Sequence, residues 1–409
     1  MTGHILRNGR LIDGAGRIWA HADIRVTDDG IVTVSAERLD DEQVAWIDLA
    51  GRTVVPGLMN CHAHICGAPM DLPPGSTPSQ VVAQHAVRAA RWLERALQQG
   101  VTAIRDLGGF EHIELAVKRM IEQGIIAGPR LRAAGRQVCM TGGHGCYGGA
   151  IEADGPDEVR KAVRAQLKAG ADVIKVMATG GIMTPGTQPA SAQLTPAELA
   201  AAVEEAHKAG RTVAAHAEGR VGIRNAILAG VDSIEHGYEL DDDLIELMLA
   251  GGTFLCPTLT CDIFIAEHGA EVDLPPDAVE KMKRWIDPLL TSFQRANRAG
   301  VRIAAGNDGF ADWVPIGGMA AEVAAMVQYG MDPHQALIAA TANAAELLQL
   351  PDEGIVGPGK RANLVVLDGD PLTDIAALAK VVAVMKDGEW VSAWPSPAAQ
   401  RAGSMGSRG

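Results

Sequence analysis

A single pattern recurs along the chain: a helix-like run ends in glycine, and a short apolar run follows at once. It occurs in LQQGVTAIRD, LKAGADVIKV, HKAGRTVAAHA, LAGVDSIEHG, LAGGTFLCP and NRAGVRIAAGND. Glycine is the residue with which many helices end, in the left-handed conformation. Each apolar run is short and mostly β-branched, as expected of a strand that is buried on both faces. The pattern predicts an alternating α/β fold.

The number of strands narrows this fold class. Eight strand candidates lie near residues 54–62, 101–107, 130–138, 172–178, 212–217, 232–236, 253–258 and 302–307. The helix before the fifth candidate has clear start signals, with Thr195 as N-cap, Pro196 at the first helical position and Glu198 completing a capping box. Eight βα units predict a (β/α)8 TIM barrel over residues 54–353, because such barrels usually span about 250 residues before insertions.

The two ends of the chain differ from this middle part. Residues 1–53 and 354–395 consist of short strand-like runs, and neither end has enough apolar surface to form a domain alone. We therefore predict one small β-sandwich domain that is built from both termini. The tail, residues 396–409, is low in apolar residues and is predicted to be disordered.

Charge and composition restrict the classes of partner. The formal net charge of -14 argues against nucleic acid and anionic membranes, which need a basic face, and leaves a small-molecule substrate as the expected partner. The N-terminus has no continuous apolar segment, and the six cysteines include no Cys-x-x-Cys pair. We expect a cytoplasmic protein with reduced thiols and no membrane anchor. The sequence leaves open whether the protein forms a homo-oligomer.

Polar residues at the ends of the predicted strands indicate a metal site. His62 and His64 stand two positions apart, so an extended strand points both imidazoles to one face, and neutral imidazoles suit a divalent ion. Lys175 lies within an apolar strand, where burial would depress its pKa. In a TIM barrel the active site lies at the C-terminal strand ends. The candidates at these ends are His62, His64, Lys175, His216, His236 and Asp308.

The chain resembles the amidohydrolase superfamily over nearly its whole length. VVPGLMNCHAH is similar to the opening signature of that superfamily, IKVMATGG, AHAEG and IEHG to its middle, and GKRANLVVLDGDPL with VMKDG to its closing sandwich. AAGRQVCMTGGHG and VIKVMATGGI resemble most the branch of imidazolonepropionase-like proteins and of dipeptidases that act on Xaa-Pro, Xaa-Arg or Xaa-Lys and on related N-acyl amino acids.

The resemblance implies a centre of two divalent metal ions, commonly zinc. It implies that Lys175 has a CO₂-derived carbamate that bridges the two ions, which share a hydroxide. Asp308 would take the proton of the hydroxide and pass it to the leaving amine. The implied ligands of the first ion are His62, His64 and Asp308, and those of the second are His216 and His236.

Four further residues are candidates for substrate contacts. His144, in the loop TGGHG, is expected to polarise the scissile carbonyl, the alternative being a loop histidine that is bound to backbone. Arg136 is a candidate for a bidentate contact with a substrate carboxylate, although a structural ion pair fits equally well. Tyr238 and Glu218 complete the set. Some dipeptidase-like relatives have tyrosine at the position of Glu218, so their mode of substrate binding does not carry over directly.

The sequence favours a metal-dependent hydrolase that cleaves the amide bond of a dipeptide or an N-acyl amino acid. The alternative within the same fold is a hydrolase of a cyclic amide, carbamate, urea or aryl amide, xenobiotics included. A mononuclear deaminase, with Glu218 as proton shuttle, is disfavoured because deaminase branches usually lack the lysine that stands here at position 175. A non-catalytic binding protein should lack at least one ligand, and none is missing.

Overall fold

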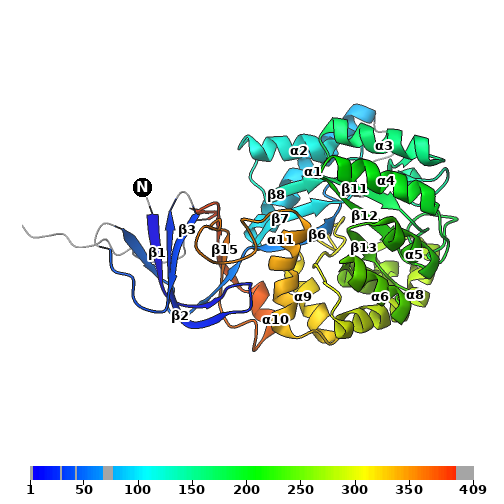
Figure 1. Ribbon diagram of the computed structural model, residues 1–409. Coiled ribbons are helices and arrows are strands. Elements are labelled where there is room, and N and C mark those ends of the chain that lie inside the picture. The colour runs from blue at the N-terminus through cyan, green and yellow to red at the C-terminus, as the bar shows by residue number, and fades with distance from the viewer. Residues whose placement is uncertain (1–2, 28–29, 42–43, 68–76, 393–409) are drawn as a thin grey trace, which may run out of the picture.

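The computed structural model describes residues 3–27, 30–41, 44–67 and 77–392, so the predicted disordered tail lies outside the described residues. A β-sheet from the two ends of the chain lies on one side, and a barrel of strands and helices lies on the other (Figure 1). Within the described part, no helix combines the length and the apolar character that a membrane span needs.

Short parallel strands form the inside of the barrel. The first three, from β6 to β8, pair in sequence order, and β9, β11, β12, β13 and β14 continue in the same direction. Their bounds are β6 (Leu58–Ala63), β7 (Val101–Asp106), β8 (Arg130–Ala133), β9 (Val138–Cys139), β11 (Val173–Met177), β12 (Thr212–Ala217), β13 (Ser233–His236) and β14 (Phe254–Cys256), with β10 (Ile151–Glu152) paired to β9. The predicted alternation of strands and helices is confirmed.

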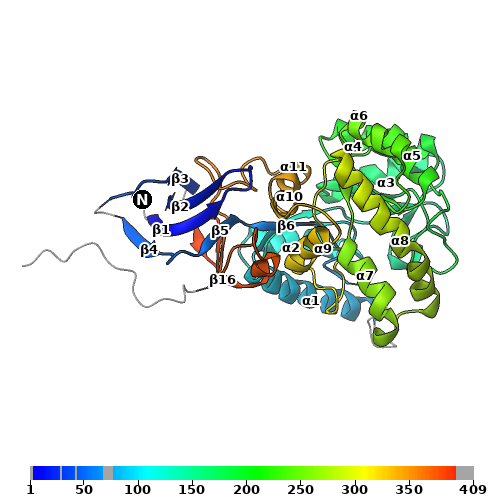
Figure 2. The same cartoon turned by 90° about the horizontal axis from the view of Figure 1, so that it is seen from below.

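Helices cover the outside of the strands, as Figures 1 and 2 show from two directions. They are α1 (Pro78–Gln98), α2 (Ile113–Glu122), α3 (Pro156–Ala169), α4 (Pro196–Lys208), α5 (Arg220–Ala229), α6 (Asp242–Gly251), α7 (Leu259–His268), α8 (Pro276–Ala299), α9 (Met319–Gln328), α10 (Pro333–Ala339) and α11 (Ala342–Leu347). The capping box of Thr195 and Glu198 is present at the start of α4. All six glycines of the recurring pattern have positive φ, namely Gly100, Gly170, Gly210, Gly230, Gly252 and Gly300.

Two predicted barrel strands are less regular than expected. The third is divided into β8 and β9, which belong to different sheets. The eighth, predicted at residues 302–307, forms only isolated bridges, from Ile303 to Leu255 and from Gly309 to Ala63. Asp308, which follows this segment, adopts a left-handed backbone with φ of 49°. The segment nevertheless closes the ring between β14 and β6.

The sheet beside the barrel contains strands from both ends of the chain, as predicted. Its order is β17-β16-β15-β5-β1-β2-β3, and β4 also pairs with β1. These strands are β1 (Gly3–Ile12), β2 (Ile18–Thr27), β3 (Gly30–Ser35), β4 (Ala45–Asp48), β5 (Thr53–Pro56), β15 (Leu364–Leu367), β16 (Val381–Lys386) and β17 (Glu389–Trp390). They share an apolar core of their own, which includes Leu6, Ile24, Val54, Leu364 and Met385.

The first predicted barrel strand belongs to two sheets. Its beginning, β5, pairs with β1 and β15 in the terminal sheet, whereas β6 pairs with β7 in the barrel. Gly57 separates them and packs against Thr102, whose Oγ1 would lie 2.1 Å from a Cβ at this position. The predicted domain boundary before residue 54 therefore falls inside β5, and the chain passes directly from one sheet into the other.

Candidate metal centre and active site

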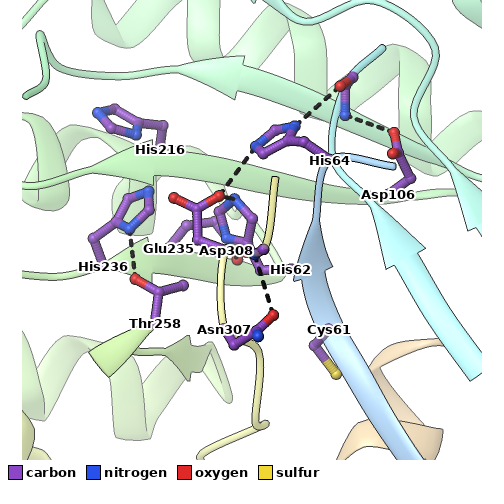
Figure 3. Close-up of polar contacts among 12 residues, drawn as sticks. Cys61, His62, His64, Asp106, His216, Glu235, His236, Thr258, Asn307 and Asp308 are labelled. Atoms are coloured by element: carbon purple, nitrogen blue, oxygen red, sulfur yellow. Dashed lines mark hydrogen bonds and ion pairs between the residues drawn. The ribbon is translucent and has the colours of Figure 1, made fainter. Parts of the chain in front are cut away.

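The strand ends of the barrel bring the six predicted ligand residues together. They line one cavity of about 240 Å³, which β6, β11, β12, β13 and the segment after Ile303 surround. Figure 3 shows the imidazoles and Asp308 facing one another, while Cys61 points away from them, as the alternation of a strand predicts. The residues are His62, His64, Lys175, His216, His236 and Asp308.

The side chains form two adjacent groups of ligand atoms. In the first group, Asp308 Oδ1 lies 3.2 Å from His64 Nε2 and 3.5 Å from His62 Nε2. In the second, ligand atoms of His216, Glu218 and His236 all lie within 4.8 Å of one another. The groups adjoin, because the ring centroids of His62 and His236 are 5.0 Å apart. The presence of Glu218 among the potential ligands was not predicted from the sequence.

Hydrogen bonds on the outer side of the rings hold three of the histidines in place. Nδ1 of His62 contacts Glu235 Oε2 at 2.8 Å, Nδ1 of His64 contacts the Gly108 carbonyl at 3.0 Å, and Nδ1 of His236 contacts Thr258 Oγ1 at 2.8 Å. A ring nitrogen that donates to such an oxygen leaves the opposite nitrogen as an acceptor. In the tautomer with the proton on Nδ1, each of these rings would present a lone pair on Nε2 toward the cavity.

Glu235 and Arg105 form a buried ion pair behind His62. Arg105 Nη2 lies 2.8 Å from Glu235 Oε1, and the Ser233 hydroxyl donates to the same oxygen. Both charged residues are at most 1% exposed. Sequence reasoning missed this pair, although a charged residue inside an apolar strand was the signal that singled out Lys175. VTAIRD and VDSIEHG contain the same signal.

Burial controls the protonation of the centre. It lowers the pKa of His62 to about 4 and that of His216 to about 3, with the charge of Lys175 acting in the same direction. It also lowers the pKa of Lys175 to about 8, although the carboxylates of Glu235 and Asp308 oppose this shift. His62 and His216 are therefore neutral at pH 7, which is the form that binds metal ions, whereas the neighbouring carboxylate of Asp308 raises the pKa of His64 above its ordinary value.

His144 lies against the second group of ligands. Its ring stacks on that of His216 with centroids 4.3 Å apart, and its Nδ1 is buried without a hydrogen-bond partner among the described residues. A Cβ on Gly181 would lie 2.5 Å from the ring, so this glycine makes room for it. Among the described residues, the backbone N–H of His144 donates to Gln193 Oε1 at 2.9 Å, and Nδ1 of the ring is not bound to backbone.

The other predicted substrate contacts divide into two cases. Tyr238 and Glu218 line the cavity, and both are almost fully buried. The guanidinium of Arg136 is directed elsewhere, with Nε donating to the Gly149 carbonyl at 2.6 Å and Nη2 to the Ala150 carbonyl at 3.3 Å. Arg136 is absent from the described cavity lining. It supports the loop after His144 instead of facing a substrate.

Comparison with known proteins identifies the family. Residues 53–391 match the family described as the amidohydrolase family. The chain belongs to this family. It is accordingly a hydrolase that acts on carbon–nitrogen bonds, and its family is typically metal-dependent. The predicted superfamily is confirmed.

Three relatives are similar over most of the chain. Ochratoxinase of Aspergillus niger is 35% identical over 413 residues, which cover 93% of this chain and 84% of the relative. The crystal structure of a Xaa-Pro dipeptidase with bound methionine is 32% identical, with a TM-score of 0.87 over 95% of this chain and 99% of the other. A prolidase complexed with N-methylphosphonate-L-proline is 31% identical, with a TM-score of 0.86 over 95% and 99%.

Proposed function

We propose that the protein is a binuclear metal-dependent hydrolase that cleaves the amide bond of a dipeptide or an N-acyl amino acid. The observation that supports this most strongly is the pair of adjacent ligand groups in one cavity. Lys175 lies in the same cavity, and its charge acts on a histidine of each group, His62 and His216. The similarity to a Xaa-Pro dipeptidase and a prolidase favours peptide-like substrates.

The residues of the site fit divalent metal ions. Asp308 Oδ1 is buried and lies 3.2 Å from His64 Nε2 and 3.5 Å from His62 Nε2, while Nδ1 of each ring is engaged on its outer side. A carboxylate and two imidazoles that converge in this way supply a set of ligands for a cation. Imidazole and carboxylate ligands suit zinc. We assign one ion to His62, His64 and Asp308, and the other to His216 and His236.

Lys175 is the bridging residue in this proposal. Its depressed pKa leaves part of the amine neutral at physiological pH, so the amine nitrogen can add to CO₂ with loss of one proton to solvent. The resulting carbamate would be an anion, and Lys175 would hold it as a ligand for the metal ions. This change also replaces a buried cation, which is costly without a partner, by a ligand of opposite charge.

The remaining chemistry belongs to the side chains around the centre. When bound, the two cations lower the pKa of water and polarise the substrate carbonyl. Asp308 accepts the proton of the attacking water and returns it to the leaving nitrogen. His144 donates a hydrogen bond to the carbonyl oxygen. Apolar side chains also line the cavity and would hold an apolar substrate group, among them Phe110, Ile182, Met183 and Phe310.

Metal content and Lys175 test the proposal together. Elemental analysis of protein prepared with zinc and bicarbonate is expected to give about two ions per chain. Lys175→Ala should lose metal and most activity on a dipeptide panel, and a short carboxylic acid should restore part of both. Lys118→Ala, which removes a helix lysine paired with Asp172, is the control and should keep both. A fully active sample with a single ion would contradict the binuclear centre and favour the deaminase.

The second candidate is hydrolysis of a cyclic amide, carbamate, urea or aryl amide. The apolar cavity wall and the relation to ochratoxinase favour it. The same zinc-loaded protein should be assayed on dipeptides, N-acyl amino acids and these compounds in parallel. Turnover of the last group alone would replace the first candidate by the second.

A further inference from the structure

The cavity is lined by more acidic than basic side chains. Among the described residues that line it, Lys175 is the only lysine and no arginine occurs, whereas Glu218, Asp262 and Asp308 supply three carboxylates. In the proposed function, Lys175 and Asp308 belong to the metal centre. Glu218 and Asp262 thus remain to be explained.

Asp262 already has its donors. The Tyr238 hydroxyl donates to Asp262 Oδ1 at 3.1 Å, and the Thr258 hydroxyl donates to Asp262 Oδ2 at 3.3 Å. Thr258 in turn contacts His236 Nδ1. Asp262 therefore orients His236 through Thr258, and both of its oxygens are used.

Glu218 lacks such donors. It follows directly on β12 and is 2% exposed, and its Oε2 is buried without a hydrogen-bond partner in the described structure. The Tyr238 hydroxyl is close enough to Glu218 to lower the pKa of this carboxyl by hydrogen bonding, but its single proton is shared with Asp262 Oδ1, which lies 3.1 Å away. His216 Nε2, 3.6 Å from Glu218 Oε1, is engaged by the Gly180 carbonyl at 3.0 Å.

The nearest further cation is also engaged elsewhere. Lys281 is buried, and its Nζ donates to the carbonyls of Ile182 and Thr184, each at 3.3 Å, and pairs with Asp277 at 2.8 Å. Among the described residues, Glu218 Oε2 thus has no donor of its own, since the neighbouring Tyr238 hydroxyl also serves Asp262. A buried carboxylate oxygen without a donor is unfavourable, so a donor is expected from a ligand.

We propose that Glu218 binds the free α-ammonium group of the substrate and makes the enzyme selective for dipeptides over N-acyl amino acids. This inference rests on the proposed amide hydrolysis. An oxygen of Glu218 lies within 4.8 Å of ligand nitrogens of both His216 and His236. In a dipeptide, the α-nitrogen is two bonds from the carbon atom of the scissile carbonyl. When that carbonyl lies at the proposed metal centre, the α-ammonium group can therefore reach the carboxylate of Glu218.

The chemistry of the cavity supports the selectivity. An ammonium that leaves water for an apolar cavity needs a counterion, and Glu218 supplies one. A substrate without the amine leaves the buried carboxylate unpaired, and sites built for a hydrogen bond reject analogues that cannot make it. The apolar wall of Phe110 and Met183 is suited to the side chain of the same residue.

A matched pair of substrates tests this role. L-leucyl-L-alanine and 4-methylpentanoyl-L-alanine differ only in the α-amine. With zinc-loaded wild type, kcat/KM should be higher for the dipeptide by roughly 10- to 100-fold, the scale of a hydrogen bond to a charged group. Glu218→Gln should remove most of this preference while zinc content stays unchanged. Glu239→Gln is the control, because Glu239 bonds to the Arg220 N–H and does not line the described cavity.

Binding measurements separate this inference from the proposed function. L-leucinamide and 4-methylpentanamide should be titrated calorimetrically into zinc-loaded wild type and Glu218→Gln. If neither peptide substrate is hydrolysed but wild type alone prefers leucinamide, the amine site holds and the proposed reaction fails. If wild type binds L-leucinamide and 4-methylpentanamide equally well, or hydrolyses L-leucyl-L-alanine and 4-methylpentanoyl-L-alanine equally well, the amine site is overturned. Loss of zinc from Glu218→Gln would overturn it as well, and would make Glu218 a metal ligand.

Discussion

Replacing Glu235 by glutamine is expected to destabilise the metal-free protein and to weaken its first metal site. Glutamine keeps the shape of Glu235 but not its charge, so Arg105, which is 1% exposed, loses the counterion 2.8 Å away. Breaking a buried ion pair by removal of one partner costs about 3–5 kcal/mol. We expect the lower end, roughly 3 kcal/mol, because the amide oxygen still accepts one hydrogen bond.

The metal site responds through His62. Glu235 Oε2 contacts His62 Nδ1 at 2.8 Å, and the amide can present its NH₂ group to this nitrogen. Partners of this kind fix the orientation of a ligand imidazole, and their loss typically weakens metal binding by about 10- to 100-fold. Arg105 therefore acts on the metal centre through Glu235, without contacting a metal ion itself.

Urea unfolding after chelation measures the first effect, and zinc competition with a chelating dye measures the second. Glu204→Gln is the matched control, since Glu204 also pairs with an arginine, Arg160, but on the surface, where the loss should be near the detection limit. The reasoning is refuted if metal-free Glu235→Gln unfolds at the same urea concentration as wild type and binds zinc equally well.

Three further changes have distinct expected outcomes. Asp308→Asn should retain part of the metal while kcat falls by roughly 10²-fold; near wild-type kcat at pH 5 to 9 would exclude Asp308 as the proton acceptor. Gly181→Ala places a Cβ 2.5 Å from the His144 ring and should lower kcat by roughly 10²-fold with unchanged zinc content; wild-type kcat would refute a role of His144 in polarising the carbonyl. Burial raises the pKa of Glu322 from 4.5 to about 7, so the folded state binds this proton more tightly than the unfolded state. The free energy of unfolding of the wild type should therefore fall relative to that of Glu322→Gln by roughly 3 kcal/mol as pH rises from 4.5 to 7, and the difference should stay constant above pH 7. If urea unfolding gives the same difference between the two proteins at every pH in this range, the raised pKa of Glu322 is contradicted.

The barrel and the convergence of the candidate ligand residues could be predicted because their signals are local. A glycine after a helix and a β-branched run after the glycine report directly on backbone conformation, and the six glycines all have the expected positive φ. The rule that barrel chemistry lies at the C-terminal strand ends then brings distant residues together without knowledge of their contacts. His62 and His236 are 174 positions apart in the chain, yet their ring centroids lie 5.0 Å apart.

What could not be predicted depends on side-chain direction across long distances. Arg136 stands at a strand end, as the ligands do, but its guanidinium turns to the carbonyls of Gly149 and Ala150. Glu218 lies two residues after His216, and its lack of a donor follows from where Tyr238 and Lys281 direct their protons. The periodicity of the sequence does not predict which partners these side chains bond to.

The backbone of two candidate ligand residues shows how their side chains are held in place where the strands are irregular. His236 and Asp308 have φ values of 71° and 49°, a region that side chains other than glycine seldom adopt and that is found mainly where surrounding contacts enforce it. For Asp308, the backbone N–H donates to the His62 carbonyl at 2.9 Å. The Asn307 side chain fixes the preceding position, since its Oδ1 accepts from Asn60 Nδ2 at 2.7 Å and from the Gly309 N–H at 3.1 Å. These bonds replace regular strand pairing and turn the carboxylate toward His62 and His64. The irregular end of the eighth strand is thus what brings the carboxylate of Asp308 to His62 and His64.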